Sequence, residues 1–158
     1  MNRQYTAEEF ADKVNLIRKY YEHPAITTDV IVGFPGETEE EFEETRQFLD
    51  KVNLYETHLF KYSRRKGTVA DKMPLQLSDK IKSDRSKVLM KYDEDRRKSF
   101  AQYYVGKEIE MLAEDSEVID GTVYRMGYTD TYVRCFSARH YGCAFRGSSV
   151  RRYRFTFP

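Results

Sequence analysis

The segment that most constrains the fold is 26–42, where a short apolar run leads directly into a glycine- and proline-containing turn and a helix start. Val30–Val32 consists of β-branched residues, which favours a buried strand of a parallel sheet. Residues 33–36 end the strand, and Thr38 with Glu41 fits the capping box that begins a helix. Ligands of α/β folds bind beyond the carboxyl ends of such strands. The pattern therefore predicts a βα loop that either lines a ligand site or simply needs unusual backbone dihedrals.

Helices and strands are expected to alternate over the first half of the chain. We expect a helix from Thr6 to about Glu22, a strand at Ile26–Val32, a helix from Glu39 to about Lys51 and a strand at Glu56–Tyr62. Helical spacing predicts one buried face on each helix. That face comprises Phe10, Val14, Ile17 and Tyr21 in the first helix, and Phe42, Thr45, Leu49 and Val52 in the second. Two strands cannot close a (β/α) barrel, which needs several more units. We therefore expect the end of a larger barrel, with Met1 at an internal boundary.

Composition excludes membrane and disulfide-rich classes. The chain has 158 residues, of which 34% are charged and 40% apolar, and this is typical of a soluble protein. No apolar run approaches the roughly 20 residues that a bilayer span requires. The two cysteines, Cys135 and Cys143, are too few for a disulfide scaffold, so we expect a cytoplasmic protein.

The second half has a different texture and charge. A helix from 78 to about 104 is expected, with a narrow apolar stripe and otherwise solvated charges; the stripe comprises Ile81, Val88, Leu89 and Tyr92. Glycine-punctuated segments then predict the strands of a small β-barrel at 108–114, 122–126, 131–136, 143–145 and 150–157. Residues 1–77 carry a net charge of −3, whereas 121–158 contains seven arginines, no lysine and one acid, a net +6. Arginines interleaved with tyrosines are typical of a surface that binds RNA, although many of the tyrosines must pack the barrel.

Three stretches resemble the radical-SAM methylthiotransferases. Thr27–Thr38, followed by Glu41-Phe42 and Glu44-Thr45, resembles a signature of that family. The pattern His58-x-Phe60-x-Tyr62-Ser63-x-Arg65-x-Gly67-Thr68 resembles a second signature, and its Arg-Arg-Lys spelling is most similar to the MtaB-type branch, which acts on N6-threonylcarbamoyladenosine in tRNA. Gly106-Lys107 and Gly127–Val133 resemble a TRAM domain, the tRNA-binding β-barrel of such enzymes.

The resemblance implies an α/β fold class: the C-terminal βα units of an incomplete radical-SAM (TIM-like) barrel, followed by a small all-β TRAM-like barrel. The implied domains are the end of the barrel at 1–77, a linking helix at 78–105 and the TRAM-like barrel at 106–158. Residues implied to contact S-adenosylmethionine are Asp29, Val32, Gly33, Phe34, His58 and Phe60. Residues expected to face substrate or RNA are Ser63, Arg65, Tyr128, Thr129, Tyr132, Arg134 and Arg146. No catalytic residue and no metal ligand is expected in this segment.

As the resemblance implies, the full enzyme replaces a C–H at carbon 2 of a modified adenosine beside the anticodon with C–SCH3. It uses S-adenosylmethionine and 4Fe-4S clusters, and its partners are a tRNA anticodon stem-loop and a missing N-terminal part of the same enzyme. Each cluster needs three closely spaced thiolates, so we expect the 158-residue chain alone to be inactive. The two cysteines are expected to be small buried side chains. A metal site formed by Cys135, Cys143 and His140 is the weaker alternative.

Two other functions stay open. One is a non-enzymatic RNA-binding module, which cysteine triads encoded upstream of Met1 would exclude. The other is the branch of the same enzymes that modifies an aspartate of a ribosomal protein. In that branch the loop after the second strand typically carries an acid where this chain has Arg65.

Overall fold

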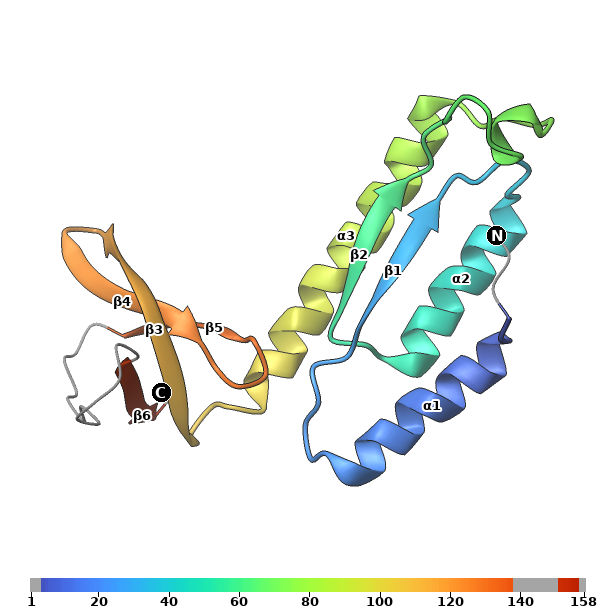
Figure 1. Ribbon diagram of the computed structural model, residues 1–158. Coiled ribbons are helices and arrows are strands. Elements are labelled where there is room, and N and C mark those ends of the chain that lie inside the picture. Colours follow the sequence, from blue (N-terminus) through green and yellow to red (C-terminus); the bar gives the residue numbers. More distant parts are fainter. Residues whose placement is uncertain (1–3, 138–150, 157–158) are drawn as a thin grey trace. The chain divides into compact units, whose positions relative to one another are not determined.

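The structure is a computed structural model that describes residues 4–137 and 151–156 (Figure 1). The chain divides into two compact units, 1–98 and 99–158. Helices and strands are both present, so the expected mixed α/β class is confirmed at that level. Within the described residues, no helix is both long and apolar enough to cross a bilayer.

Unit 1 alternates helices with two parallel strands. Its elements are α1 (Ala7–Tyr20), β1 (Thr27–Val32), α2 (Glu39–Val52), β2 (Glu56–Lys61), the short 3-10 helix η1 (Ala70–Lys72) and most of α3 (Asp79–Gln102). β1 and β2 pair in parallel from Thr27 opposite Glu56 to Val32 opposite Lys61. Each predicted helix and strand of this half is present, with ends that differ by one or two residues.

The capping box predicted at Thr38 and Glu41 forms at the start of α2, and a second one forms at the start of α1. The Thr38 hydroxyl accepts a hydrogen bond from the Glu41 backbone N–H at 3.2 Å, and the Glu41 carboxylate accepts one from the Thr38 N–H at 2.8 Å. Thr6 and Glu9 make the same reciprocal pair. Each box satisfies two N–H groups that a helix start otherwise leaves unpaired.

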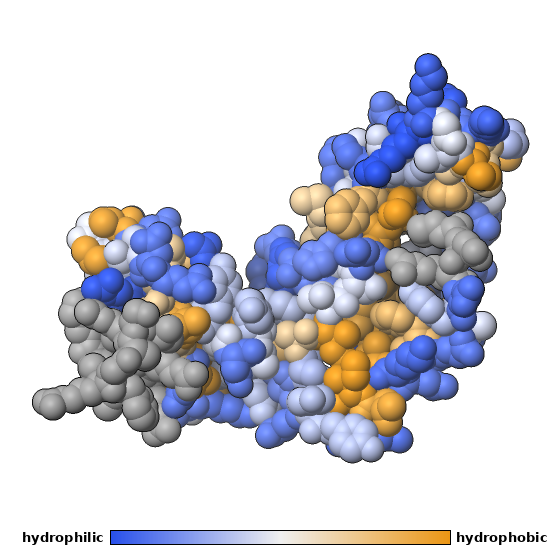
Figure 2. Space-filling view, in the orientation of Figure 1, coloured by the Kyte–Doolittle hydropathy of each residue, from blue (hydrophilic) through white to orange (hydrophobic). Residues whose placement is uncertain are grey.

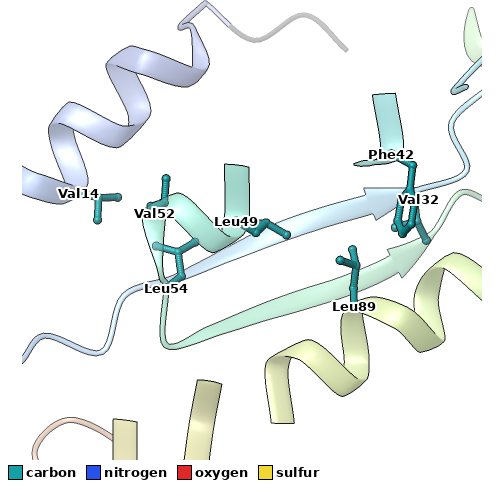
Figure 3. Packing of buried hydrophobic residues seen from close by; sticks show 7 residues of the cluster. All are labelled: Val14, Val32, Phe42, Leu49, Val52, Leu54 and Leu89. Carbon is teal, nitrogen blue, oxygen red and sulfur yellow. The ribbon is translucent and has the colours of Figure 1, made fainter. Parts of the chain in front are cut away.

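One face of the two-stranded sheet is covered by helices, and the core of unit 1 lies there (Figure 3). Its buried members are Val14, Val32, Phe42, Leu49, Val52, Leu54 and Leu89. The three apolar positions predicted on α2 are all buried. Val14 is buried and Phe10 is partly buried against the core, as predicted for the first helix, but the prediction is wrong for Ile17 and for Tyr21 at the C-cap, whose side chains are exposed.

The buried face of α3 carries charge, which the sequence pattern does not predict. Of the expected apolar stripe only Leu89 is buried, whereas Ile81 is 42% and Val88 is 47% exposed. The buried residues of the helix are Lys82, Arg85, Leu89, Asp93 and Arg96. The expectation that the charges of this helix are solvated is therefore wrong for the four charged residues of this list.

Each buried charge near the middle of α3 has a partner, which makes its burial tolerable. Asp93 accepts hydrogen bonds from the hydroxyl of Thr57 on β2 and from the guanidinium of Arg96. Arg96 also donates to the Leu49 carbonyl oxygen at 3.3 Å and lies 4.2 Å from the ring centroid of Tyr92. Polar contacts hold this helix on unit 1 together with its one buried leucine.

Unit 2 is built on a four-stranded antiparallel sheet. The strands are β3 (Glu108–Ile119), β4 (Thr122–Tyr128), β5 (Arg134–Ser137) and β6 (Arg151–Thr156), in the order β5-β4-β3-β6. Tyr104, Ile109, Met111, Val133 and Cys135 form its core. The described strands do not close into a barrel, and the expected strand at 143–145 lies outside the described residues.

Two strand boundaries differ from the predictions by more than two residues. β3 extends to Ile119 because Asp120 and Gly121 form a two-residue hairpin turn, with φ of 48° and 76°. Two central residues with positive φ match the twist of the flanking strands, and an Asp-Gly pair is a standard signal for this turn. The strand expected at 131–136 begins only at Arg134, because the preceding residues form a tight loop.

Candidate functional site

The turn between β1 and α2 is fixed by its own hydrogen bonds. Gly33 and Gly36 have φ of +73° and +85°, a region that favours glycine. The Gly33 N–H donates to the Glu37 carboxylate at 2.7 Å, and the Glu37 N–H donates to the Phe34 carbonyl at 2.9 Å. The Gly36 N–H donates to the Leu75 carbonyl at 3.0 Å. The turn is therefore a rigid feature at the carboxyl end of the sheet.

Gly33 is also required by the close approach of α3. A Cβ added at this position would lie 2.4 Å from Cγ of Lys82 and 3.3 Å from its Cβ and Cδ. At Gly36, by contrast, an added Cβ would meet nothing within 4 Å. The first glycine serves backbone conformation and packing together, and the second serves conformation alone.

Arg85 of α3 holds the same turn from outside. Its guanidinium donates to the Glu37 carboxylate at 2.5 Å, to the Glu37 carbonyl at 3.1 Å and to the Glu39 carboxylate at 3.1 Å. The group also lies 5.2 Å from the ring centroid of Phe42. Arg85 and Glu37 are both largely buried, so this ion pair is screened little by solvent. No motif in the sequence pairs these two residues, and sequence reasoning missed both.

Two aromatic rings meet beyond the ends of the strands. Phe34 and Tyr62 form an edge-to-face pair with ring centroids 5.3 Å apart, and the Tyr62 N–H donates to the Val32 carbonyl at 2.9 Å. Among the described residues, the buried Tyr62 hydroxyl has no hydrogen-bond partner. The Lys82 ammonium lies 5.8 Å from the Tyr62 ring centroid.

The other face of the sheet brings together three of the residues expected at the cofactor site. In the parallel register Asp29 lies opposite His58, and Ile31 lies opposite Phe60. Asp29 and His58 are exposed and Phe60 is 53% exposed. This uncovered face presents a carboxylate, an imidazole and an aromatic ring. The apolar run of β1 thus has one face in the core and one face open.

The remaining expected cofactor residues lie elsewhere at this end. Val32 is 1% exposed and belongs to the core face, so its side chain does not reach the open face. Gly33 and Phe34 lie in the turn itself. A groove of about 630 Å³ borders the open face where β2 meets α3, and its lining includes His58 and Phe60. Hydrophobic patches also interrupt the hydrophilic surface of unit 1 in Figure 2.

The loop after β2 presents the two residues expected to face the substrate. Ser63 and Arg65 are both exposed. The loop is ordered by the Thr68 hydroxyl, which donates to the Arg65 carbonyl at 2.8 Å, and by an ion pair between Arg64 and Asp71 at 3.0 Å. The side chains of Ser63 and Arg65 are therefore carried on a structured segment and stay accessible to a ligand.

In unit 2, the expected RNA-binding residues cluster at the end of β4 and the start of β5. Tyr128 lies opposite Arg134 in the antiparallel register, and the rings of Tyr128 and Tyr132 are 6.2 Å apart. Tyr132 is 77% exposed, whereas Thr129 is 6% exposed and its hydroxyl accepts the Val133 N–H at 3.0 Å. Thr129 thus holds the loop that carries Tyr132. Arg146 lies outside the described residues.

Cys135 is buried in unit 2, where its thiol donates to the Val133 carbonyl. Burial raises the pKa of this thiol to about 11, so it is neutral and unreactive at neutral pH. Among residues 4–137 and 151–156, no three His, Cys, Asp or Glu side chains are grouped as a metal site requires. Cys143 and His140, the other members of the alternative metal site, lie outside those residues.

Comparison with known proteins gives consistent matches. Residues 1–49 match the Radical SAM superfamily model. The chain is 40% identical over 136 residues, 85% of its length, to the threonylcarbamoyladenosine tRNA methylthiotransferase MtaB of Bacillus subtilis, of which it covers 30%. It is 44% identical over 112 residues, 71% of its length, to the tRNA-2-methylthio-N(6)-dimethylallyladenosine synthase of Caldicellulosiruptor saccharolyticus, of which it covers 24%. A probable threonylcarbamoyladenosine tRNA methylthiotransferase of Methanocaldococcus jannaschii is 40% identical over 84% of the chain, which covers 29% of that protein. The chain therefore spans less than a third of the length of each of these relatives.

Proposed function

The chain belongs to the radical-SAM methylthiotransferases, and from this membership we propose that it is the C-terminal portion of an enzyme that methylthiolates an adenosine of tRNA. In this proposal, carbon 2 of N6-threonylcarbamoyladenosine beside the anticodon exchanges hydrogen for a methylthio group. The protein works in the cytoplasm on the anticodon stem-loop, together with a part that carries the iron–sulfur clusters. The described elements of unit 1 supply one wall of the reaction site.

One observation carries the proposal: the 40% identity to the Bacillus subtilis MtaB protein over 85% of the chain. That match covers residues from both units, since neither unit alone is so long. The relatives named for N6-dimethylallyladenosine have similar identities, so the choice of modified adenosine rests on the Arg64-Arg65-Lys66 spelling of the loop after β2.

The open face of the sheet fits part of an S-adenosylmethionine molecule. This cofactor has a flat aromatic adenine, ribose hydroxyls that donate hydrogen bonds, and a charged amino acid moiety. Phe60 offers an apolar ring, Asp29 accepts hydrogen bonds from hydroxyl or ammonium groups, and His58 both donates and accepts. When bound, the cofactor would supply the radical that abstracts hydrogen and the transferred methyl group. The residues of this chain would bind and orient it, with the rigid turn at Gly33 limiting the pocket.

The iron–sulfur clusters do not fit this chain. A site-differentiated cluster of this kind needs three thiolates, and the whole sequence contains two cysteines. Cys135 is buried with a raised pKa, which disfavours the thiolate that a metal requires. The proposal therefore assigns cluster binding to another part of the enzyme. Anaerobic iron–sulfur reconstitution that loads a stoichiometric cluster onto this chain would contradict it.

A chimera tests the activity. This chain replaces the aligned segment of the Bacillus subtilis relative in a strain that lacks its own enzyme, and nucleosides of digested tRNA are measured by mass spectrometry. We expect the methylthio derivative of N6-threonylcarbamoyladenosine to return. A matched chimera with its cluster cysteines replaced by alanine controls for other sources of the modification. A folded, cluster-loaded chimera that methylthiolates no tRNA nucleoside would refute the proposal.

A direct binding experiment tests the RNA partner. The seven arginines of 121–158 should make phosphate contacts, so affinity for an anticodon stem-loop should fall steeply with salt. Five such contacts would give a slope of about −3.5 to −4.5 in log affinity against log salt. Weak binding that does not change between two salt concentrations would exclude this surface as an RNA-binding site.

A non-enzymatic RNA-binding module is the second candidate, favoured by the cysteine count. It predicts the same salt-dependent binding of the stem-loop but no methylthiolation by the chimera. The two experiments together therefore separate the candidates.

A further inference from the structure

Unit 2 contains a pocket between β3 and the loop that joins β4 to β5. Its volume is about 490 Å³, which suits a flat group of the size of a nucleobase or a side chain. The lining residues are Glu110, Met111, Leu112, Glu114, Tyr128, Thr129, Asp130 and Tyr132. All of these residues belong to unit 2.

One wall of the pocket is a pair of tyrosines held in place by a strained loop. The rings of Tyr128 and Tyr132 are tilted by 46° with centroids 6.2 Å apart. Tyr132 has φ of +61°, which is rare for an aromatic residue and persists only where the surroundings enforce it. Here its N–H donates to the Thr129 carbonyl at 3.0 Å, and the Val133 N–H donates to the Thr129 hydroxyl at 3.0 Å. The loop therefore presents a largely exposed ring on a fixed backbone.

The opposite wall is formed by a β-bulge. The pairing of β3 with β4 shifts between Ala113 and Asp115, so Glu114 has no partner on β4. A bulge re-aims side chains and is common beside binding sites. Gly127 permits it, because an added Cβ there would lie 1.9 Å from the Leu112 carbonyl oxygen. Leu112 itself is 39% exposed and adds apolar surface to the pocket.

The charge of the pocket is opposite to that of the arginine-rich segment. Three carboxylates line it, those of Glu110, Glu114 and Asp130, and none of the lining residues whose side chains the structure describes is a lysine or an arginine. Carboxylates accept hydrogen bonds and repel phosphate. The pocket therefore selects a flat group that stacks on tyrosine and presents N–H donors at its edge.

We propose that this pocket takes a single unpaired nucleobase of RNA and prefers guanine. The inference rests on the proposed binding of RNA by unit 2 and adds which part of the RNA enters this site. Guanine offers the adjacent donors N1–H and N2–H, which match the two oxygens of one carboxylate, either Glu114 or Asp130. Uracil has a single N3–H between two carbonyl oxygens, which the carboxylates repel. Unpaired bases of RNA loops are commonly held by stacking and by hydrogen bonds to this edge.

The test uses the full 158-residue chain and two fluorescent probes, an oligouridylate and the same oligouridylate with one central guanosine. Fluorescence anisotropy at low and moderate salt gives the two affinities. A bidentate contact to a base predicts roughly 5- to 150-fold tighter binding of the guanosine probe. Probes with adenosine or cytidine at that place, which have one donor edge each, should fall between.

Variants locate the preference in the pocket. Glu114→Gln and Asp130→Asn, separately and together, should reduce the ratio between the probes while oligouridylate binds as well as before or better. Asp115→Asn is the matched control, because it removes a carboxylate from the same strand outside the pocket lining and should leave the ratio unchanged. Tyr132→Ala should lower the affinity for the guanosine probe more than the affinity for the oligouridylate, since it removes the stacking surface.

Three outcomes would overturn the inference. Equal affinities for both probes with strong salt dependence would exclude the pocket but leave RNA binding by unit 2 intact. If neither probe binds at low salt, both the base-binding pocket and the proposed RNA binding by unit 2 would be excluded. Displacement of the guanosine probe by arginine amide and not by guanosine monophosphate would instead assign the pocket to a cationic side chain of a protein.

Discussion

Replacement of Gly33 by alanine tests whether the turn after β1 is shaped by its contact with α3. Two costs are expected. An alanine at φ of +73° loses roughly 1–2 kcal/mol through its left-handed backbone. The methyl group must also displace the Lys82 stem, whose Cγ lies 2.4 Å from its position, and overpacking of this kind costs about 1–3 kcal/mol. The free energy of unfolding should therefore fall by about 2–5 kcal/mol.

Gly36→Ala provides the matched control. Its φ of +85° imposes a similar backbone cost, but an added Cβ meets nothing within 4 Å. Its expected loss is about 1–2 kcal/mol, and the difference between the two variants isolates the steric cost. In a Lys82→Ala background, which removes the obstructing stem beyond Cβ, Gly33→Ala should cost no more than Gly36→Ala.

Urea unfolding followed by the helical circular dichroism signal measures these losses, because α1, α2 and most of α3 belong to unit 1. The double-mutant cycle between positions 33 and 82 should show a coupling free energy of about 1–3 kcal/mol. Equal losses at Gly33 and Gly36, or a loss at Gly33 that stays as large after Lys82 is truncated as before, would refute the close contact between this turn and α3.

Three further predictions concern two other contacts of unit 1 and the buried thiol of unit 2. Arg85→Met leaves the Glu37 carboxylate buried without its cation, so the free energy of unfolding should fall by about 3–5 kcal/mol. Adding Glu37→Gln to this variant should recover part of the loss. If urea titrations show no recovery, the ion pair does not contribute as inferred. Thr38→Ala removes the cap of α2 and should cost about 0.5–2 kcal/mol, whereas Thr38→Ser, which keeps the acceptor, should be nearly neutral in the same titration. Cys135 has its pKa raised from 9.0 to about 11, so the unfolded chain loses this proton first and stability should fall as the pH rises through that window. Cys135→Ala should flatten this alkaline fall in the urea midpoint, and an unchanged pH profile would show that the thiol does not contribute.

The helices and strands of unit 1 were predictable because local signals agree with one another. Capping boxes mark the starts of α1 and α2, and the β-branched run followed by glycines marks β1 and its turn. The close approach of Gly33 to Lys82 was not predictable, since it depends on two residues far apart in sequence. The Asp120-Gly121 hairpin was readable from its turn residues, and a longer β3 follows from them.

The attachment of α3 shows where pattern reasoning fails. Hydropathy marks Ile81 and Val88 as buried, but the helix turns Arg85 and Asp93 inward, where partners on other elements satisfy them. A one-dimensional pattern cannot show those partners. At the candidate site, the open face with Asp29 and His58 follows from strand alternation, whereas the carboxylate-lined pocket of unit 2 depends on a bulge and a strained loop.

The Arg85–Glu37 contact limits which substitutions are tolerated at these two positions during evolution. Replacement of Arg85 alone leaves the Glu37 carboxylate buried without its cation, and replacement of Glu37 alone leaves Arg85 with only the exposed Glu39 carboxylate as an ionic partner, so single changes at either position should be selected against. Homologues should therefore keep both residues or replace both, for example with a pair of hydrophobic residues. Positions 37 and 85, which lie 48 residues apart in the sequence, should therefore vary together.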